Sequence, residues 1–108
     1  MIPRQTLPPA KVIAVDIDGT LLCDGQINRI LINWCQQKQH DGYRLMLWSA
    51  RGLEYAQRFV EHYGLHGIFD DIVSKPGYIV DDQGWAWTRY THIINNIQGH
   101  SINKRKGP

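Results

Sequence analysis

The sequence predicts an α/β fold in which a mainly parallel β-sheet carries helices on both faces. Two continuous apolar runs, residues 11–17 and 43–49, are typical of strands buried on both faces of a sheet. Each run is followed by a stretch whose apolar residues recur at helical spacing. Strands that alternate with helices indicate a parallel sheet, and right-handed crossovers then bring the helices onto both of its faces.

The elements can be justified in chain order. Residues 1–10 contain three prolines and are expected to form an irregular arm. From Ile27 the apolar positions have helical spacing, and Gly42 is placed to end that helix. A second helix begins near Leu53 and stops at Gly64.

The C-terminal part is expected to add two short strands and a helix. The strands are residues 71–74 and 78–81, which flank the tripeptide Lys-Pro-Gly. Apolar residues from Trp87 to Ile97 suggest a last amphipathic helix. Residues 99–108 are expected to be a flexible basic tail.

Composition indicates one globular domain, residues 1–108, with 43% apolar and 20% charged residues. A net charge of +2 does not point to nucleic acid or a membrane as partner, and nucleic acid stays open. No signal-like segment and no apolar run long enough to span a membrane is present. Cys23 and Cys35 have no metal-type or disulfide spacing, so we expect a cytoplasmic protein.

Three of the predicted strands end in polar side chains. These side chains belong to Asp16, Asp18, Ser49, Arg51, Asp81 and Asp82. Ligands of parallel sheets bind outside the carboxyl ends of the strands, so these residues should converge. Asp16 and Asp18 lie two positions apart and point to the same side, where they need a cation or a shared proton. With Asp81 or Asp82 they would form an oxygen cage that suits Mg²⁺.

These motifs resemble those of the haloacid dehalogenase (HAD) superfamily. The sequence Asp-Ile-Asp-Gly-Thr-Leu-Leu at 16–22 resembles its first motif, and the strand 45–49 ending in Ser49 resembles the second. The acidic pair after residues 79–80 resembles the fourth. The resemblance covers residues 11–84 and implies a three-layer Rossmann-like fold with phosphatase activity.

The resemblance also implies a role for each residue. Asp16 would be the nucleophile, and Asp18 would be the acid and base that protonates the leaving oxygen and later activates water. Ser49 would donate its hydroxyl to a phosphoryl oxygen. Mg²⁺ would bridge Asp16, the backbone carbonyl of Asp18, one of the acidic pair Asp81 and Asp82, and the phosphate.

The third motif of the superfamily, a lysine, has one candidate here, Lys75. It precedes Asp81 by only five intervening residues, which would place it at the wrong end of a strand over 78–81 unless the chain folds back. Arg51 is the other candidate, because a guanidinium binds phosphate well. Both residues remain candidates for binding the phosphate.

The gaps between motifs leave no room for a cap domain. Residues 21–27 fit only a small flap, and residues 52–74 hold one helix and a short strand. An open site would admit a bulky phosphorylated substrate, including a macromolecule, or would take a lid from another subunit of a homo-oligomer. Together with the acidic residues, the resemblance to the HAD superfamily implies a magnesium-dependent phosphomonoester hydrolase acting through Asp16. The alternatives are a polynucleotide-end phosphatase and a degenerate binding or regulatory module.

Overall fold

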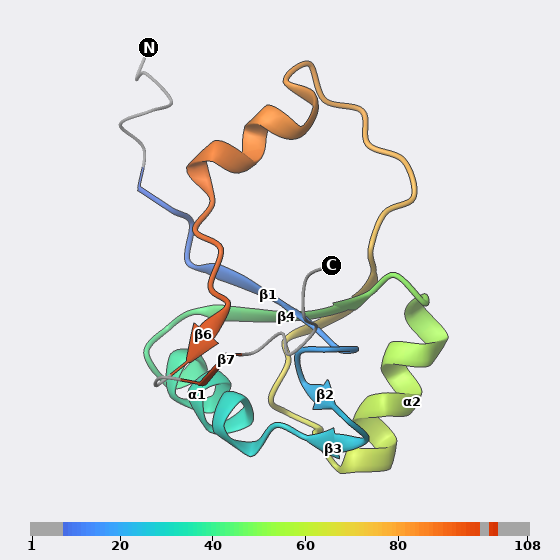
Figure 1. Cartoon of the computed structure of the whole chain (residues 1–108). Coiled ribbons are helices and arrows are strands. Elements are labelled where there is room, and N and C mark those ends of the chain that lie inside the picture. Colours follow the sequence, from blue (N-terminus) through green and yellow to red (C-terminus); the bar gives the residue numbers. More distant parts are fainter. Residues whose placement is uncertain (1–7, 98–99, 102–108) are drawn as a thin grey trace.

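The computed structural model describes residues 8–97 and 100–101 of the chain (Figure 1). A three-stranded parallel sheet forms its centre, in the order β1-β4-β5. These strands are β1 (Val12–Asp16), β4 (Arg44–Ser49) and β5 (Asp71–Ser74). The parallel sheet and the three strands predicted for this part of the chain are confirmed.

Helix α1 (Arg29–His40) connects β1 to β4, as the apolar spacing predicts. Asn28 caps its start, because the side-chain oxygen accepts a hydrogen bond from the backbone N–H of Leu31 at 3.1 Å. The helix ends at Asp41, and Gly42 follows with a φ of 94°, which a side chain would oppose. The predicted helix and its stop are confirmed.

Helix α2 (Leu53–Tyr63) connects β4 to β5. Its C-cap is Gly64, in the left-handed conformation that favours glycine at this position. Ala56, Phe59 and Val60 form its buried face.

A small antiparallel hairpin lies between β1 and α1. It pairs β2 (Leu22–Cys23) with β3 (Gln26–Ile27) through a turn at Asp24 and Gly25, both with positive φ. This hairpin is the small flap that the sequence allows. The part of the chain that the structure describes holds no cap domain, as predicted.

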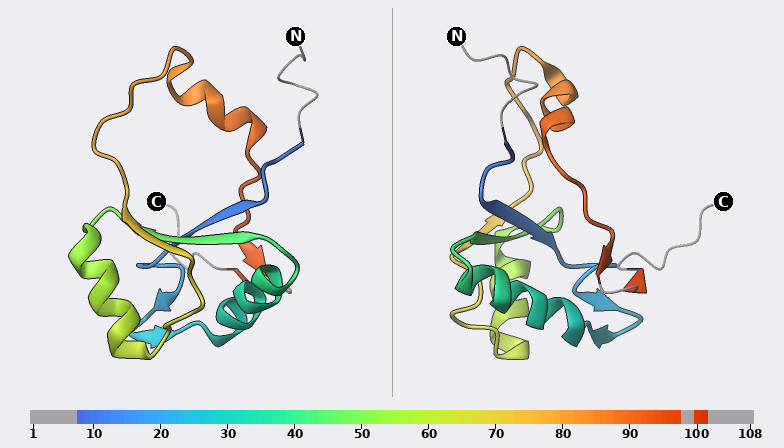
Figure 2. Two further views of the ribbon diagram at one scale, coloured as in Figure 1. Left: turned by 180° about the vertical axis from the view of Figure 1, so that it is seen from behind. Right: turned by 90° about the vertical axis from the view of Figure 1, so that its left-hand side faces the viewer.

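Both α-helices lie on the same face of the sheet (Figures 1 and 2). The expected second helical layer is therefore not found within residues 8–97. The physical reason is the strand order: β4 is added beside β1 and β5 beside β4, so the sheet grows in one direction. Right-handed crossover connections that add successive strands in the same direction place their helices on the same face of the sheet. On the opposite face, Val12 is 50% exposed and Ala14 is exposed.

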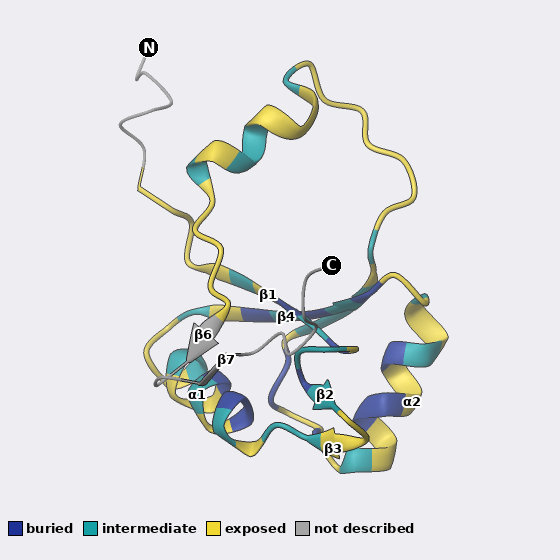
Figure 3. Ribbon diagram, viewed as in Figure 1, coloured by how far each residue is buried: buried dark blue, intermediate teal, exposed yellow. Residues whose placement is uncertain are grey.

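The buried apolar side chains of the described residues form one cluster between the sheet and these helices (Figure 3). Its members are Val15, Ile17, Leu21, Leu31, Ile32, Cys35, Leu45, Leu47, Ala56, Phe59, Val60, Leu65, Ile68 and Phe69. The alternation along β4, in which Leu45 and Leu47 point inward, orients that strand. The core thus anchors the carboxyl ends of β1 and β4.

The predicted strand over 78–81 is not formed. Tyr78 and Val80 are 95% and 103% exposed, and the segment pairs with none of the strands. The predicted helix from Trp87 is also wrong, because a 3₁₀ helix, η2 (Gly84–Tyr90), takes its place and buries no residue. Apolar spacing stabilises a helix or strand only where it packs on another surface, and this segment arches away from the sheet (Figure 1).

The chain continues from η2 into a short antiparallel pair. It joins β6 (Asn96–Ile97) to β7 (His100–Ser101). The predicted basic tail over 99–108 otherwise lies outside the described residues, as do residues 1–7 of the predicted arm. Among the helices of residues 8–97, none is long and apolar enough to cross a membrane.

Candidate active site

The loop that leaves β1 presents two carboxylates because the residues between and after them are buried. Ile17 and Leu21 are fully buried, which fixes the loop to the core. The backbone of Thr20 and Leu22 donates hydrogen bonds to the carbonyl of Ile17 at 3.1 and 2.9 Å. Gly19 takes a φ of 83°, which lets the chain turn sharply. Strand β1 therefore ends in a hydrogen-bonded turn that leaves the side chains of Asp16 and Asp18 partly exposed to solvent.

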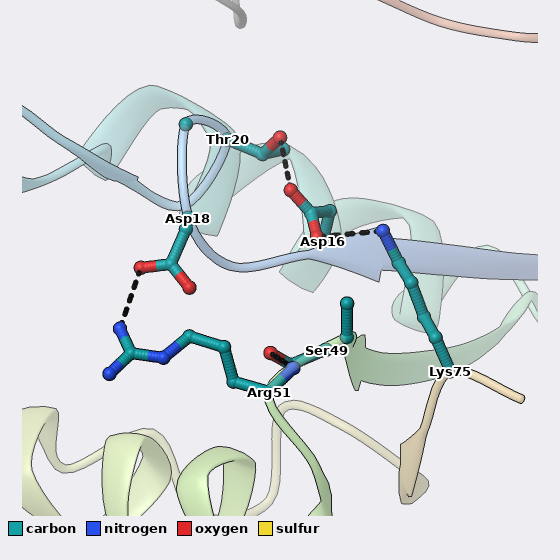
Figure 4. Close-up of a pocket in the computed structure, with 8 residues that line it drawn as sticks. Asp16, Asp18, Thr20, Ser49, Arg51 and Lys75 are labelled. Atoms are coloured by element: carbon teal, nitrogen blue, oxygen red, sulfur yellow. Dashed lines mark hydrogen bonds and ion pairs between the residues drawn. The ribbon is translucent and has the colours of Figure 1, made fainter. Parts of the chain in front are cut away.

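Asp16 is the last residue of β1, and both of its carboxylate oxygens have partners (Figure 4). The hydroxyl of Thr20 donates to Oδ2 at 3.1 Å, and the ammonium of Lys75 donates to Oδ1 at 2.9 Å. The Asp16 and Lys75 side chains are about one-third exposed, at 32% and 33%. The carboxylate is thus held in one orientation while open to solvent.

Lys75 reaches the site by a route that the sequence analysis did not foresee. It directly follows β5, whose carboxyl end lies at the same edge as those of β1 and β4. Its backbone N–H donates to the carbonyl of Ser49 at 3.0 Å. The chain does not need to fold back, because the third strand of the sheet is 71–74 and not 78–81. Lys75 therefore follows the carboxyl end of a strand instead of preceding its amino end.

Ser49 ends β4 and is 2% exposed. Its hydroxyl oxygen accepts a hydrogen bond from the backbone N–H of Arg51 at 3.0 Å. The serine therefore both shapes the loop after β4 and keeps its own hydroxyl proton available to a ligand.

These residues surround an open pocket of about 650 Å³. It is lined by Asp16, Asp18, Gly19, Thr20, Ser49, Ala50, Arg51 and Lys75. Five of the seven predicted site residues are thus brought together, at the carboxyl ends of three parallel strands.

A comparison with known protein families supports the family that the motifs around this pocket resemble. A family model for haloacid dehalogenase-like hydrolases matches residues 13–106, which is most of the chain. The chain belongs to the HAD-like hydrolases. No curated protein and no solved structure matches it. The resemblance predicted from the three motifs is therefore confirmed, and the pocket is the candidate active site of a HAD-like hydrolase.

The remaining two predicted residues of this HAD-like hydrolase, Asp81 and Asp82, do not line the pocket. Asp81 accepts a hydrogen bond from the backbone N–H of Gln83 at 2.8 Å, and Asp82 contacts the side chain of Gln83. Both are exposed. The expectation that they meet Asp16 depended on a strand over 78–81, and that strand is not formed.

The pocket residues fit a magnesium ion in part. Asp16 and Asp18 offer carboxylate oxygens, and Mg²⁺ in such sites uses one or two carboxylates together with substrate phosphate. No group of three or more His, Cys, Asp or Glu side chains that could hold a metal occurs within residues 8–97. The pocket itself therefore offers two carboxylates, and any further carboxylate ligand would have to come from outside its lining.

One pocket neighbour was missed by sequence reasoning. Tyr55, in the first turn of α2, donates its hydroxyl to Oδ1 of Asp18 at 2.8 Å. Burial, together with this hydrogen bond, raises the pKa of the Tyr55 phenol above its ordinary value. The signal available was its position, because the helix that follows a strand of a parallel sheet begins at the carboxyl edge.

Proposed function

We propose that this HAD-like hydrolase is a magnesium-dependent phosphatase that cleaves phosphate monoesters through an aspartyl-phosphate on Asp16. The observation that carries the proposal is the pairing of the Asp16 carboxylate with Thr20 and Lys75 in an open pocket beside Asp18. A nucleophile needs such fixed orientation, because attack depends on the alignment of the reacting atoms.

The first half of the reaction forms the covalent intermediate. An oxygen of Asp16 attacks phosphorus, the bond to the ester oxygen breaks, and Asp18 gives its proton to that leaving oxygen. The positive charge of Lys75 offsets the repulsion between the carboxylate and the anionic phosphate. Ser49 donates its hydroxyl to a phosphoryl oxygen.

The second half restores the enzyme. The Asp18 carboxylate takes a proton from water, the water oxygen attacks phosphorus, and the bond to Asp16 breaks to release inorganic phosphate. Asp18 ends with the proton that it lost in the first half.

Magnesium would be held by the carboxylate of Asp16, the backbone carbonyl of Asp18, and Asp81 or Asp82. When bound, it neutralises charge on the phosphoryl oxygens. The chain from Lys75 to Asp81 can extend about 20 Å, so its length allows the acidic pair to join the pocket. We propose that Mg²⁺ together with phosphate stabilises that arrangement.

The open pocket supports a bulky substrate. The Arg51 side chain is 64% exposed at the rim, and no cap covers the site in the described residues. A phosphorylated macromolecule, a polynucleotide end among them, could therefore present its phosphate while the rest stays in solvent.

The test is hydrolysis of p-nitrophenyl phosphate with Mg²⁺ and with EDTA, followed by a panel of phosphorylated metabolites and end-phosphorylated oligonucleotides. We expect activity only with Mg²⁺, and loss of at least about 99% of it in the Asp16→Asn variant, because the amide is a poor nucleophile. Asp24→Asn is the matched control, since Asp24 is exposed on the hairpin turn outside the pocket. If Asp16→Asn keeps more than a few per cent of the activity without deamidation, Asp16 is not the nucleophile.

A further inference from the structure

Asp18 is held from outside the β1 loop by two residues that follow β4. Tyr55 donates its hydroxyl to Oδ1 of Asp18 at 2.8 Å, although 37 residues separate them in the sequence. The guanidinium of Arg51 lies 3.8 Å from the same oxygen (Figure 4) and 4.1 Å from the centre of the Tyr55 ring. One carboxyl oxygen is thus occupied, and the ring that occupies it is itself packed against a cation.

The engaged oxygen determines which oxygen is left for the reacting group. Oδ1 of Asp18 accepts from Tyr55 and faces Arg51, so Oδ2 is the oxygen that remains to face a ligand. Oδ2 lies on the side of the carboxyl group nearer to Ser49 (Figure 4). Proton transfer requires the correct oxygen to face the reacting group.

Asp18 needs this restraint because its side chain is 43% exposed. An exposed aspartate samples several staggered rotamers, and only some of them direct Oδ2 into the pocket. Tyrosine is suited to the task because it has few rotatable bonds, and the stacked Arg51 limits the ring further.

We propose that Tyr55 is a positioning residue that fixes the carboxyl group of Asp18 so that Oδ2 faces the leaving group. This inference rests on the proposed function, in which Asp18 is the acid. Tyr55 touches neither the substrate nor the metal, and acts only through Asp18. The guanidinium of Arg51 supports it by holding the ring.

Tyr55→Phe tests the proposal, because it removes the hydroxyl and keeps the ring on which Arg51 stacks. Two substrates are compared. p-Nitrophenyl phosphate has a leaving group that departs with little protonation, whereas an alkyl phosphate such as glycerol phosphate needs the acid. We expect kcat for the alkyl phosphate to fall about 10-fold or more, as part of the 10²–10⁴-fold that a general acid supplies. We expect kcat for p-nitrophenyl phosphate to fall less than about threefold, and KM to stay unchanged for both.

The matched control is Tyr63→Phe, the same substitution at the other end of α2, where Tyr63 packs on Phe59 and His62. It should leave both substrates unaffected. If Tyr55→Phe lowers kcat equally for both substrates, or for neither, the proposal is overturned, because a merely structural residue would not distinguish leaving groups.

Crystal structures of the wild type and of Tyr55→Phe provide a readout that does not depend on turnover. We expect one orientation of Asp18 in the wild type, and a changed or multiple orientation in the variant. A single unchanged orientation in the variant overturns the positioning role even if the enzyme is active. If the wild type hydrolyses no phosphate ester while Asp18 reorients in the variant, the proposed function fails and the positioning of Asp18 by Tyr55 stands.

Discussion

Lys75 and Arg51 bring positive charge to opposite sides of the pocket, and their surroundings differ (Figure 4). Lys75 contacts the carboxylate of Asp16 at 2.9 Å and lies 5.5 Å from the centre of the Trp48 ring. Arg51 sits at the rim with its side chain 64% exposed. A cation against the proposed nucleophile would stabilise charge that develops during the reaction, whereas a rim cation would bind ground and transition states alike.

We therefore predict different kinetic effects for two alanine variants. Lys75→Ala should lower kcat about 100-fold, the order found when one charge-stabilising group is removed from an active site. Arg51→Ala should raise KM about 5- to 10-fold and leave kcat within about threefold, because Tyr55 keeps its shorter contact with Asp18. Steady-state kinetics on p-nitrophenyl phosphate measures both.

Lys38→Ala is the control for these variants, since Lys38 lies on α1 against the rings of Trp34 and Tyr43 and does not line the pocket. It should leave both kinetic constants unchanged. A kcat for Lys75→Ala within twofold of the wild type would show that Lys75 makes no contact that matters in the transition state.

Cys35, on the buried face of α1, should make the free energy of unfolding depend on pH. Burial raises the pKa of its thiol to about 12, whereas the thiol of an unfolded chain ionises near pH 8.5. Above that pH the unfolded chain loses a proton that the folded chain keeps, so the free energy of unfolding falls as pH rises toward 12. Below that pH this contribution to stability is fully present.

Urea unfolding at pH 8 and pH 10.5 tests this expectation. The wild type should lose more stability between these two pH values than Cys35→Ala does, because the variant has no thiol to ionise at this position. Cys23→Ala, at a half-buried position, should behave like the wild type. Equal losses in the wild type and Cys35→Ala would mean that the Cys35 thiol does not ionise differently in the two states.

Much of the site could be predicted at the scale of residues. Asp16, Asp18, Ser49 and Arg51 were predicted from the rule that ligands bind at the carboxyl ends of parallel strands, and the structure places them there. For Tyr55 the same rule indicates only that it lies near this edge, in the first turn of α2. Its contact with Asp18 depends on how α2 leaves the sheet, and that angle is a property of packing rather than of local sequence.

Among the elements, α2 carries Tyr55, and its C-terminal end depends on Gly64. Gly64 has a φ of 64°, so a side chain there is strained although its Cβ would meet no atom within 4 Å. We predict that Gly64→Ala lowers the free energy of unfolding by about 1 kcal/mol. Urea unfolding followed by circular dichroism measures it.

Gly77→Ala is the matched control, because Gly77 has no positive φ and its Cβ would also be in open space. It should change stability by less than about 0.5 kcal/mol. If the two variants lose the same stability, the left-handed backbone at position 64 does not penalise a side chain, and the prediction is wrong.

The elements from β1 to β5 follow the sequence prediction, whereas the part after Lys75 does not. Up to β5 every apolar pattern has a partner surface, since the strands pair and α1 and α2 cover them. The apolar run over 78–81 and the periodic residues after Trp87 have the same patterns without a partner. A pattern states which face could be buried, and tertiary contacts decide whether it is.

At the scale of the whole molecule, the sheet has one covered and one open face, and the segment 76–95 holds no buried residue. From Lys75, at the pocket itself, to β6 the chain therefore adds nothing to the buried core. The side chains of Tyr78 and Val80, the most exposed large apolar ones among the described residues, follow directly. A segment of this kind is where proteases cut first, because it enters a protease site without unfolding the core.

We accordingly predict that chymotrypsin cuts after Tyr78 or the 72% exposed Trp85 before any site in the core. If Mg²⁺ and phosphate bring Asp81 or Asp82 to Asp16, as proposed, these ligands should slow that cut severalfold, because cleavage then requires the bound arrangement to open. The double variant Asp81→Asn/Asp82→Asn controls for effects on the protease and should be cut at one rate with and without the ligands. Mass spectrometry of timed digests identifies the sites. A wild-type cutting rate that Mg²⁺ and phosphate leave unchanged, in an enzyme whose hydrolysis requires Mg²⁺, would show that the metal is held by the pocket residues alone.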